Sequence, residues 1–97
     1  MERNQNIKLD NGKPLMELIP PSAIEALGEV LTYGANKYSP NSWQKVEPER
    51  YLGALMRHLT AYMRDPKSVD KESGILHIKH ILCNAAFLVD FAEKEGL

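Results

Sequence analysis

Prolines divide this chain into three segments, and each segment carries apolar residues at helical spacing. Pro20 and Pro21 precede the first segment, and Pro66 separates the second from the third. Because proline is excluded from helix interiors but tolerated in the first turn, these positions limit where helices can run. The predicted helices span about 22–37, 49–64 and 75–95. We therefore expect an all-α fold, a small bundle of three main helices.

The first helix has a recognisable start signal. Ser22 follows the two prolines and Glu25 stands three residues later, a spacing that predicts a capping box. Residues 1–18 are polar with scattered apolar side chains, so we expect an irregular N-terminal arm with one short strand around 15–19. Residues 38–48 contain two prolines and are predicted to be a loop without regular structure.

The third predicted helix is apolar on two faces. Its second face consists of Leu76, Cys83, Phe87 and Phe91. A helix of this kind is either central in a protein or shared between subunits. With only two other helices available in 97 residues, we expect a homo-oligomer whose main contact is the third helix.

Length and charge narrow the class of protein. A chain of 97 residues is expected to form one domain, 1–97, and its net charge of −1 gives no signal of a DNA partner. The most apolar stretch, 75–92, is interrupted by polar residues, so we expect no membrane partner and no membrane span. One cysteine and no signal-peptide pattern point to a cytoplasmic protein.

A polar stripe crosses the otherwise apolar third helix. His77, His80 and Asn84 lie on one side of it at i, i+3 and i+7. Polar groups in such surroundings need partners. The stripe is either an edge that faces a ligand or metal ion, or a hydrogen-bonded network between helices.

Two carboxylates lie one turn apart on the first helix. Glu25 and Glu29 have the spacing at which carboxylates can hold Mg²⁺ against the phosphates of a nucleotide. The alternative is a solvated helix face, with Glu25 also serving the cap.

Basic and aromatic side chains surround the first loop and the second helix. Arg57 can bind a phosphate with both arms of its guanidinium, beside His58. The residues that could stack a base or contact phosphate are Lys37, Tyr38, Asn41, Trp43 and Lys45. The alternatives are surface ion pairing for Arg57, a hydrogen bond at the edge of the core for His58, and a core-capping role for Trp43.

Several short motifs, in order and at characteristic spacing, resemble a known family. They are Leu18-Ile19-Pro20-Pro21, Glu29, Tyr33-Gly34-Ala35, Lys37-Tyr38, Asn41, Trp43, Leu55-Met56-Arg57-His58, Glu72-Ser73-Gly74, His77, His80 and Cys83-Asn84. Together they resemble the small phage-type domain named for dATP/dGTP diphosphohydrolases, which is related to the all-α NTP pyrophosphohydrolases, the MazG-like proteins. The resemblance runs from about Leu15 to Asp90.

The resemblance implies an oligomer that binds a nucleoside triphosphate in the cytoplasm. If a phage encodes the protein, this is the cytoplasm of the host cell. It also implies Mg²⁺ or Mn²⁺ as cofactor. The metal ligands it implies are Glu25, Glu29, Glu72 and Asp90, and the catalytic residues are Glu29, Glu72 and His58. The substrate-binding residues are Lys37, Tyr38, Asn41, Trp43, Arg57, His77, His80 and Asn84.

Two functions follow from the resemblance and its departures. The first is metal-dependent hydrolysis of a (deoxy)nucleoside triphosphate to monophosphate and pyrophosphate. However, the Glu-Glu-x-x-Glu signature of the wider superfamily is missing, and Gly53 stands where many relatives carry an acidic residue. The alternative is therefore an oligomer that sequesters a nucleotide, such as a cyclic immune signal, without cutting it. A purely structural assembly protein would explain the apolar third helix but not its polar stripe.

Overall fold

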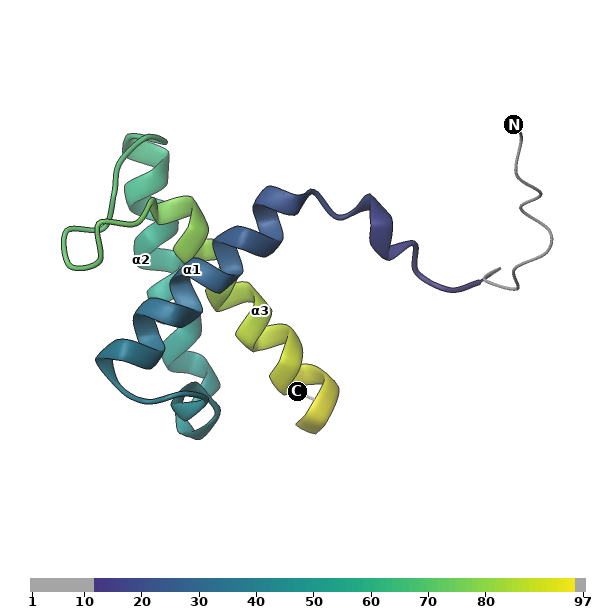
Figure 1. Ribbon diagram of the computed structural model, residues 1–97. Coiled ribbons are helices and arrows are strands. Elements are labelled where there is room, and N and C mark those ends of the chain that lie inside the picture. Colours follow the sequence, from purple (N-terminus) through teal and green to yellow (C-terminus); the bar gives the residue numbers. More distant parts are fainter. Residues whose placement is uncertain (1–11, 96–97) are drawn as a thin grey trace, which may run out of the picture.

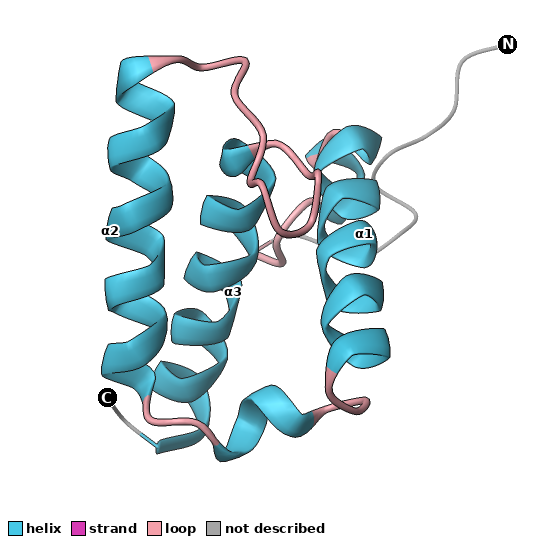
Figure 2. Cartoon of the chain, turned by 90° about the vertical axis from the view of Figure 1, so that its left-hand side faces the viewer, coloured by secondary structure: helices cyan, strands magenta, loops and turns pink. Residues whose placement is uncertain are grey.

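Three long helices that run in alternating directions form the protein (Figure 1). The structure is a computed structural model, and it describes residues 12–95. The helices are α1 (Pro21–Lys37), α2 (Pro48–Arg64) and α3 (His77–Glu95). Two short 3₁₀ helices, η1 (Met16–Leu18) and η2 (Ser42–Lys45), precede α1 and α2. Helix α3 lies between the other two and packs against both (Figure 2). The predicted all-α bundle is confirmed.

Prolines start two of the helices. Pro21 is the first residue of α1 and Pro48 the first of α2, where the fixed φ of proline suits the helix and its missing N–H costs no hydrogen bond. Ser22 therefore lies inside the first turn, and no side chain caps α1. The predicted capping box of Ser22 and Glu25 is wrong, because the proline moves the helix start ahead of the serine.

The remaining local predictions were partly wrong. The segment Met16–Leu18 is a 3₁₀ helix, so the strand expected around 15–19 does not form. The rest of the predicted arm, residues 1–11, lies outside the described residues. The loop 38–48 contains one 3₁₀ turn, Ser42–Lys45.

The connection between α2 and α3 folds back on itself. Val69 and Leu76 pair in an isolated antiparallel bridge, and the amide of Asp70 donates to the carbonyl of Ile75 at 2.8 Å. Gly74 takes a φ of 73°, a conformation that suits glycine. This turn uses residues that the apolar pattern assigned to the helix, and α3 therefore begins two residues later than predicted, at His77.

A small core joins α1 and α3. Val30, Ile75 and Cys83 are buried together, and the half-buried Leu27, Tyr33 and Phe87 pack against them. Burial raises the pKa of the Cys83 thiol to about 11, so this cysteine is an apolar core residue and not a nucleophile.

The second apolar face of α3 is used within the chain. Phe87 and Phe91 contact Trp43 and Tyr51, and α3 leaves mainly Ile78 and Val89 exposed. The predicted contact between subunits through α3 stays a prediction. No helix among residues 12–95 is long and apolar enough to cross a membrane.

Candidate functional site

A cavity of about 1150 Å³, which we call the α1–α2 groove, is lined by α1, α2, α3 and the segment 38–46. Glu72, from the loop before α3, completes its wall. Ligand pockets commonly measure about 300–1,000 Å³. The groove therefore has room for a ligand of nucleotide size.

Most of the predicted site residues line this groove. Those that do are Lys37, Tyr38, Asn41, Trp43, Arg57, His58, Glu72, His80, Asn84 and Asp90. Three predicted residues, Glu25, Glu29 and His77, are not among its lining residues. The fold thus brings the predicted ligand-binding residues of three helices to one place, but not the carboxylates of α1.

An aromatic cluster forms one end of the groove. The Trp43 ring stacks on Phe87 with their centres 4.4 Å apart, and meets Phe91 edge to face at 5.7 Å. The Tyr51 hydroxyl donates to the Trp43 carbonyl at 2.9 Å. The core-capping alternative for Trp43 is confirmed, because one face of its ring is covered by Phe87. A role for Trp43 in stacking a base stays a prediction.

Tyr38 is the freer aromatic side chain. It is 70% exposed, and the Lys37 ammonium lies 5.0 Å from the centre of its ring. Both residues line the groove at the end of α1. An aromatic ring beside a cation can stack a base and contact a phosphate at the same time.

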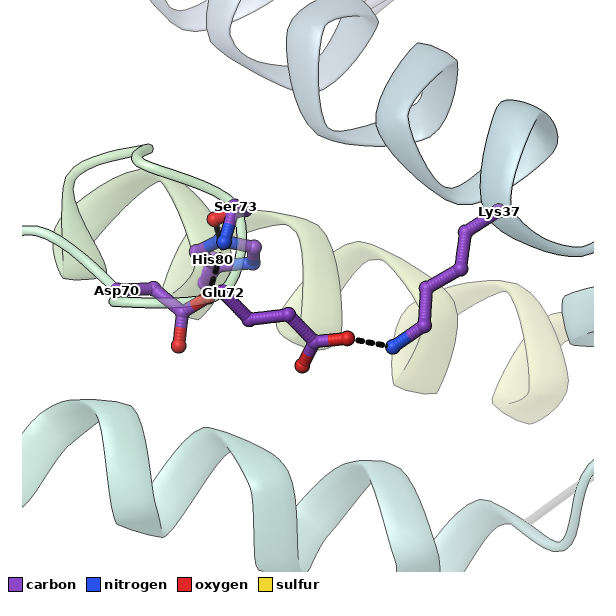
Figure 3. Close-up of polar contacts among 5 residues, drawn as sticks. All are labelled: Lys37, Asp70, Glu72, Ser73 and His80. Carbon is purple, nitrogen blue, oxygen red and sulfur yellow. Dashed lines mark hydrogen bonds and ion pairs between the residues drawn. The ribbon is translucent and has the colours of Figure 1, made fainter.

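An ion pair bridges the groove. The Lys37 ammonium donates to the Glu72 carboxylate, which reaches toward it from the loop before α3 (Figure 3). The hydrogen bond from Lys37 lowers the pKa of Glu72, and the same bond raises the pKa of Lys37. Glu72 is therefore ionised and Lys37 charged at neutral pH.

Two arginines of α2 add positive charge to the groove. Arg50 and Arg57 both line it and are seven residues apart, so they lie on the same side of the helix. With Lys37 they supply three cations, and Glu72 and Asp90 supply two anions. Phosphate groups would therefore bind along the wall formed by α2 and the end of α1, where these three cations lie.

The three histidines of the chain lie together beside the groove. The Nδ1 atoms of His58 and His77 are 2.8 Å apart and hydrogen-bonded, and the His58 ring stacks on His80 at 4.5 Å. The Asn84 amide donates to the His80 carbonyl at 2.8 Å. Burial lowers the pKa of both His58 and His80, so both rings are neutral at pH 7. The network alternative for the polar stripe is confirmed for these contacts.

Asp70 and Ser73 support this histidine group from the loop (Figure 3). The Ser73 amide donates to Asp70 Oδ2 at 2.9 Å, and the Ser73 hydroxyl is hydrogen-bonded to His80 Nε2 at 2.7 Å. Partial burial works to raise the pKa of Asp70, but the hydrogen bonds from Ser73 lower it below its usual value. The carboxylate is therefore ionised at neutral pH.

The four carboxylates implied as metal ligands are spread over the molecule. Glu29 pairs with Lys79 at 3.0 Å, Asp90 with Lys94 at 2.9 Å, and Glu72 with Lys37. Glu25 is exposed on α1. Within residues 12–95, no three of these four carboxylates offer oxygens close enough to share an ion. One chain therefore does not fit Mg²⁺ with this set of ligands.

Three residues of the site were not predicted to belong to it. Arg50 could have been found from its seven-residue spacing to Arg57. Asp70 and Ser73 lie in the turn before α3, where the Ser73 hydroxyl is hydrogen-bonded to His80 and the Ser73 amide donates to Asp70. Only the fold of the loop places them there.

Comparison with known proteins places the chain in a family. The family model described as "dATP/dGTP diphosphohydrolase, N-terminal" matches residues 3–97. A protein of Salmonella phage PMBT28, named dATP/dGTP diphosphohydrolase, is 34% identical over 82 residues, which is 84% of this chain. The matched region is 28% of that protein, so the chain spans less than a third of the length of this relative. No solved structure matches the chain.

Proposed function

The chain belongs to the dATP/dGTP diphosphohydrolase N-terminal family, and from this premise we propose that the α1–α2 groove binds a deoxynucleoside triphosphate. The observation that carries the proposal is the gathering of the predicted binding residues around one cavity of suitable size. The reaction named for the phage relative is that of a longer protein, so hydrolysis by this chain is part of the proposal.

The aromatic and the basic residues that line the groove suggest how a nucleotide would lie in it. Tyr38, exposed and next to a lysine, offers a ring face to the base. Arg50 and Arg57 offer guanidinium groups to the phosphates along α2. A triphosphate would supply anionic groups to these two arginines, neither of which forms an ion pair within residues 12–95.

Phosphate binding would change the Lys37–Glu72 pair. A phosphate oxygen can replace the Glu72 carboxylate as the acceptor for Lys37, since both are anionic. Glu72 is then a free carboxylate inside the groove, where it can orient a water molecule toward the phosphate chain. Lys37, Arg57 and His58 would stabilise the charge that develops. One chain does not bring the implied Mg²⁺ ligands together; a second subunit that brings Glu29 or Glu25 to the groove would change this.

Pyrophosphate release from dATP and dGTP tests the enzyme proposal. The native protein, with Mg²⁺ or Mn²⁺, should release pyrophosphate, and Glu72→Gln should lose most of the activity. Glu93→Gln is the matched control, since this glutamate is exposed near the end of α3 and does not line the groove. Equal rates for the native protein and Glu72→Gln would contradict the role of Glu72.

The sequestering alternative has one observation in its favour. Glu29, Glu72 and Asp90 are each paired with a lysine, so these three residues offer no cluster of free carboxylates to a hard cation. Under this alternative, a nucleotide binds tightly without metal and is recovered intact after incubation. Mass spectrometry of the bound nucleotide before and after incubation with Mg²⁺ distinguishes the two functions.

A further inference from the structure

The strongest convergence of metal-binding atoms in the described residues lies outside the implied carboxylate set. One ring nitrogen each from His58 and His77 and one carboxylate oxygen from Asp70 lie within 4.8 Å of one another. They come from α2, from the first residue of α3 and from the loop between them. We propose that these three residues bind one divalent transition-metal ion, such as Zn²⁺, Co²⁺, Ni²⁺ or Mn²⁺.

The spacing of the ligand atoms suits such an ion. Ligands at about 2.1 Å from a metal ion are about 3.4 Å apart in the tetrahedral geometry of Zn²⁺. In an octahedral site, adjacent ligands are about 3 Å apart and opposite ones about 4.2 Å apart. The two Nδ1 atoms, at 2.8 Å, are already near the separation of adjacent ligands. The widest pair, at no more than 4.8 Å, would need to close by at most about 1.4 Å to reach the tetrahedral spacing. In the metal-free protein, the two nitrogens share a proton instead.

The chemical types of the three ligands indicate which class of metal ion would bind. Two imidazoles with one carboxylate suit first-row transition ions, whereas Mg²⁺ and Ca²⁺ prefer oxygen ligands only. Three protein ligands also leave coordination positions open for water or a bound anion.

Neighbouring residues hold two of the ligands in place. The Ser73 amide donates to Asp70 Oδ2, and the His80 ring stacks on His58 with an angle of 6° between the rings. Groups of this kind around a site fix ligand orientation and contribute to metal affinity.

The cluster is accessible from solvent. Asp70 and His77 line a second cavity, of about 470 Å³, between the end of α2 and the following loop. His58 lines the α1–α2 groove on the other side. An ion can therefore enter through the second cavity without crossing the α1–α2 groove.

Metal uptake by the untagged full chain, measured without nucleotide, tests this proposal independently of the proposed function. Titration with Co²⁺, followed by its visible absorption, should saturate at one ion per chain, and Zn²⁺ should displace it while excess Mg²⁺ should not. Asp70→Asn and His77→Gln should each weaken Co²⁺ binding at least about 100-fold, beyond the loss seen on removing a supporting group. Asp65→Asn is the matched control, because Asp65 lies in the same loop, lines the same cavity and is not one of the three ligands.

Three outcomes would overturn the proposal. They are the absence of saturable Co²⁺ or Zn²⁺ binding to the native protein, unchanged affinity in both variants, and displacement of Co²⁺ by Mg²⁺. Circular dichroism checks that the variants are folded. If His77→Gln does not fold, the paramagnetic shifts that Co²⁺ causes in the histidine signals of the native protein identify the ligands. A shift at His80 alone, with none at His58 or His77, would also contradict the site.

Discussion

Arg57 lies in the groove on the face of α2 that carries two further arginines. It lines the cavity, and its guanidinium can bind two phosphate oxygens. Arg57→Ala should weaken nucleotide binding by about 1.5–3 kcal/mol, the scale of a hydrogen bond to a charged group, and leave the fold intact. Calorimetry measures the change. Arg64→Ala is the control, seven residues further along α2 and outside the groove, and equal affinities for both variants would place Arg57 outside the binding site.

Asn41 combines two possible roles at one position. Its φ is 64°, in the left-handed region that asparagine tolerates better than most residues, and it lines the groove. Asn41→Ala should lower the free energy of unfolding by about 1 kcal/mol, since alanine is strained there. Asn41→Gly keeps the backbone conformation and removes only the amide. Native stability with weakened nucleotide binding in Asn41→Gly assigns the amide to the ligand, whereas native binding would contradict the predicted contact.

His58 and His80 should make stability depend on pH. Burial lowers the pKa of both below the usual 6.5, so the folded protein binds fewer protons than the unfolded chain. Their contribution is fully present above 6.5 and is lost as pH falls through the lowered pKa values. Urea unfolding in the presence of a chelator should therefore show stability that falls as the pH is lowered below 6.5.

His58→Gln should flatten this dependence. The carboxylates with lowered pKa values, Asp70 and Glu72, lose their contribution only at lower pH, below their usual 3.8 and 4.5. The two effects are therefore separable. A pH profile that is the same for the native protein and His58→Gln would exclude His58 as a source.

Among the elements, α1 contains a glycine that nothing in the described structure requires. Gly28 is exposed in the middle of α1, and a Cβ there would meet nothing within 4 Å. Gly28→Ala should raise the free energy of unfolding by about 0.5–1 kcal/mol through helix propensity. The same substitution at Gly74, whose φ is 73°, should lower it by about 1 kcal/mol. Urea unfolding compares both, and destabilisation by Gly28→Ala would show that another chain approaches α1 at this point.

The helices were predictable from the sequence because their signals are local. Proline positions and apolar periodicity predicted the first residue of α2 to within one position. The start of α3 was missed by two residues because a bridge between Val69 and Leu76 competes with the helix, and apolar spacing does not reveal such a bridge. The predicted Ser22 cap was wrong because the proline before the serine begins the helix itself.

The site was predictable in part for the same reason. Periodicity tells which residues share a helix face, and this placed His80 with Asn84; the same spacing could have added Arg50 to Arg57. It does not tell how a loop folds, so Asp70 and Ser73 were not assigned. The lysine partners of Glu29 and Glu72 lie 50 and 35 residues away in the sequence, and only tertiary structure brings them together.

At the scale of the whole molecule, α2 presents an apolar stripe to solvent. Leu52, Met56, Leu59 and Met63 are 48, 58, 40 and 74% exposed. Their spacing of four, three and four residues is that of the contact positions of a coiled coil. A second copy of the chain could cover this stripe with its own α2. Burying the exposed part of each of these side chains would contribute about 1 kcal/mol or more to the free energy of association.

We therefore propose that the predicted oligomer forms through α2 in addition to, or in place of, α3. Analytical ultracentrifugation of the native protein at micromolar concentration should show a species larger than the 11.0 kDa chain. Met56→Glu combined with Met63→Glu should dissociate it while circular dichroism stays helical, because both side chains are exposed in the single chain and a charge in a subunit contact is costly. Val89→Glu, on the exposed part of α3, tests the contact first predicted from the sequence. Dissociation by Val89→Glu alone would assign the contact to α3, and a native monomer at this concentration would contradict both arrangements.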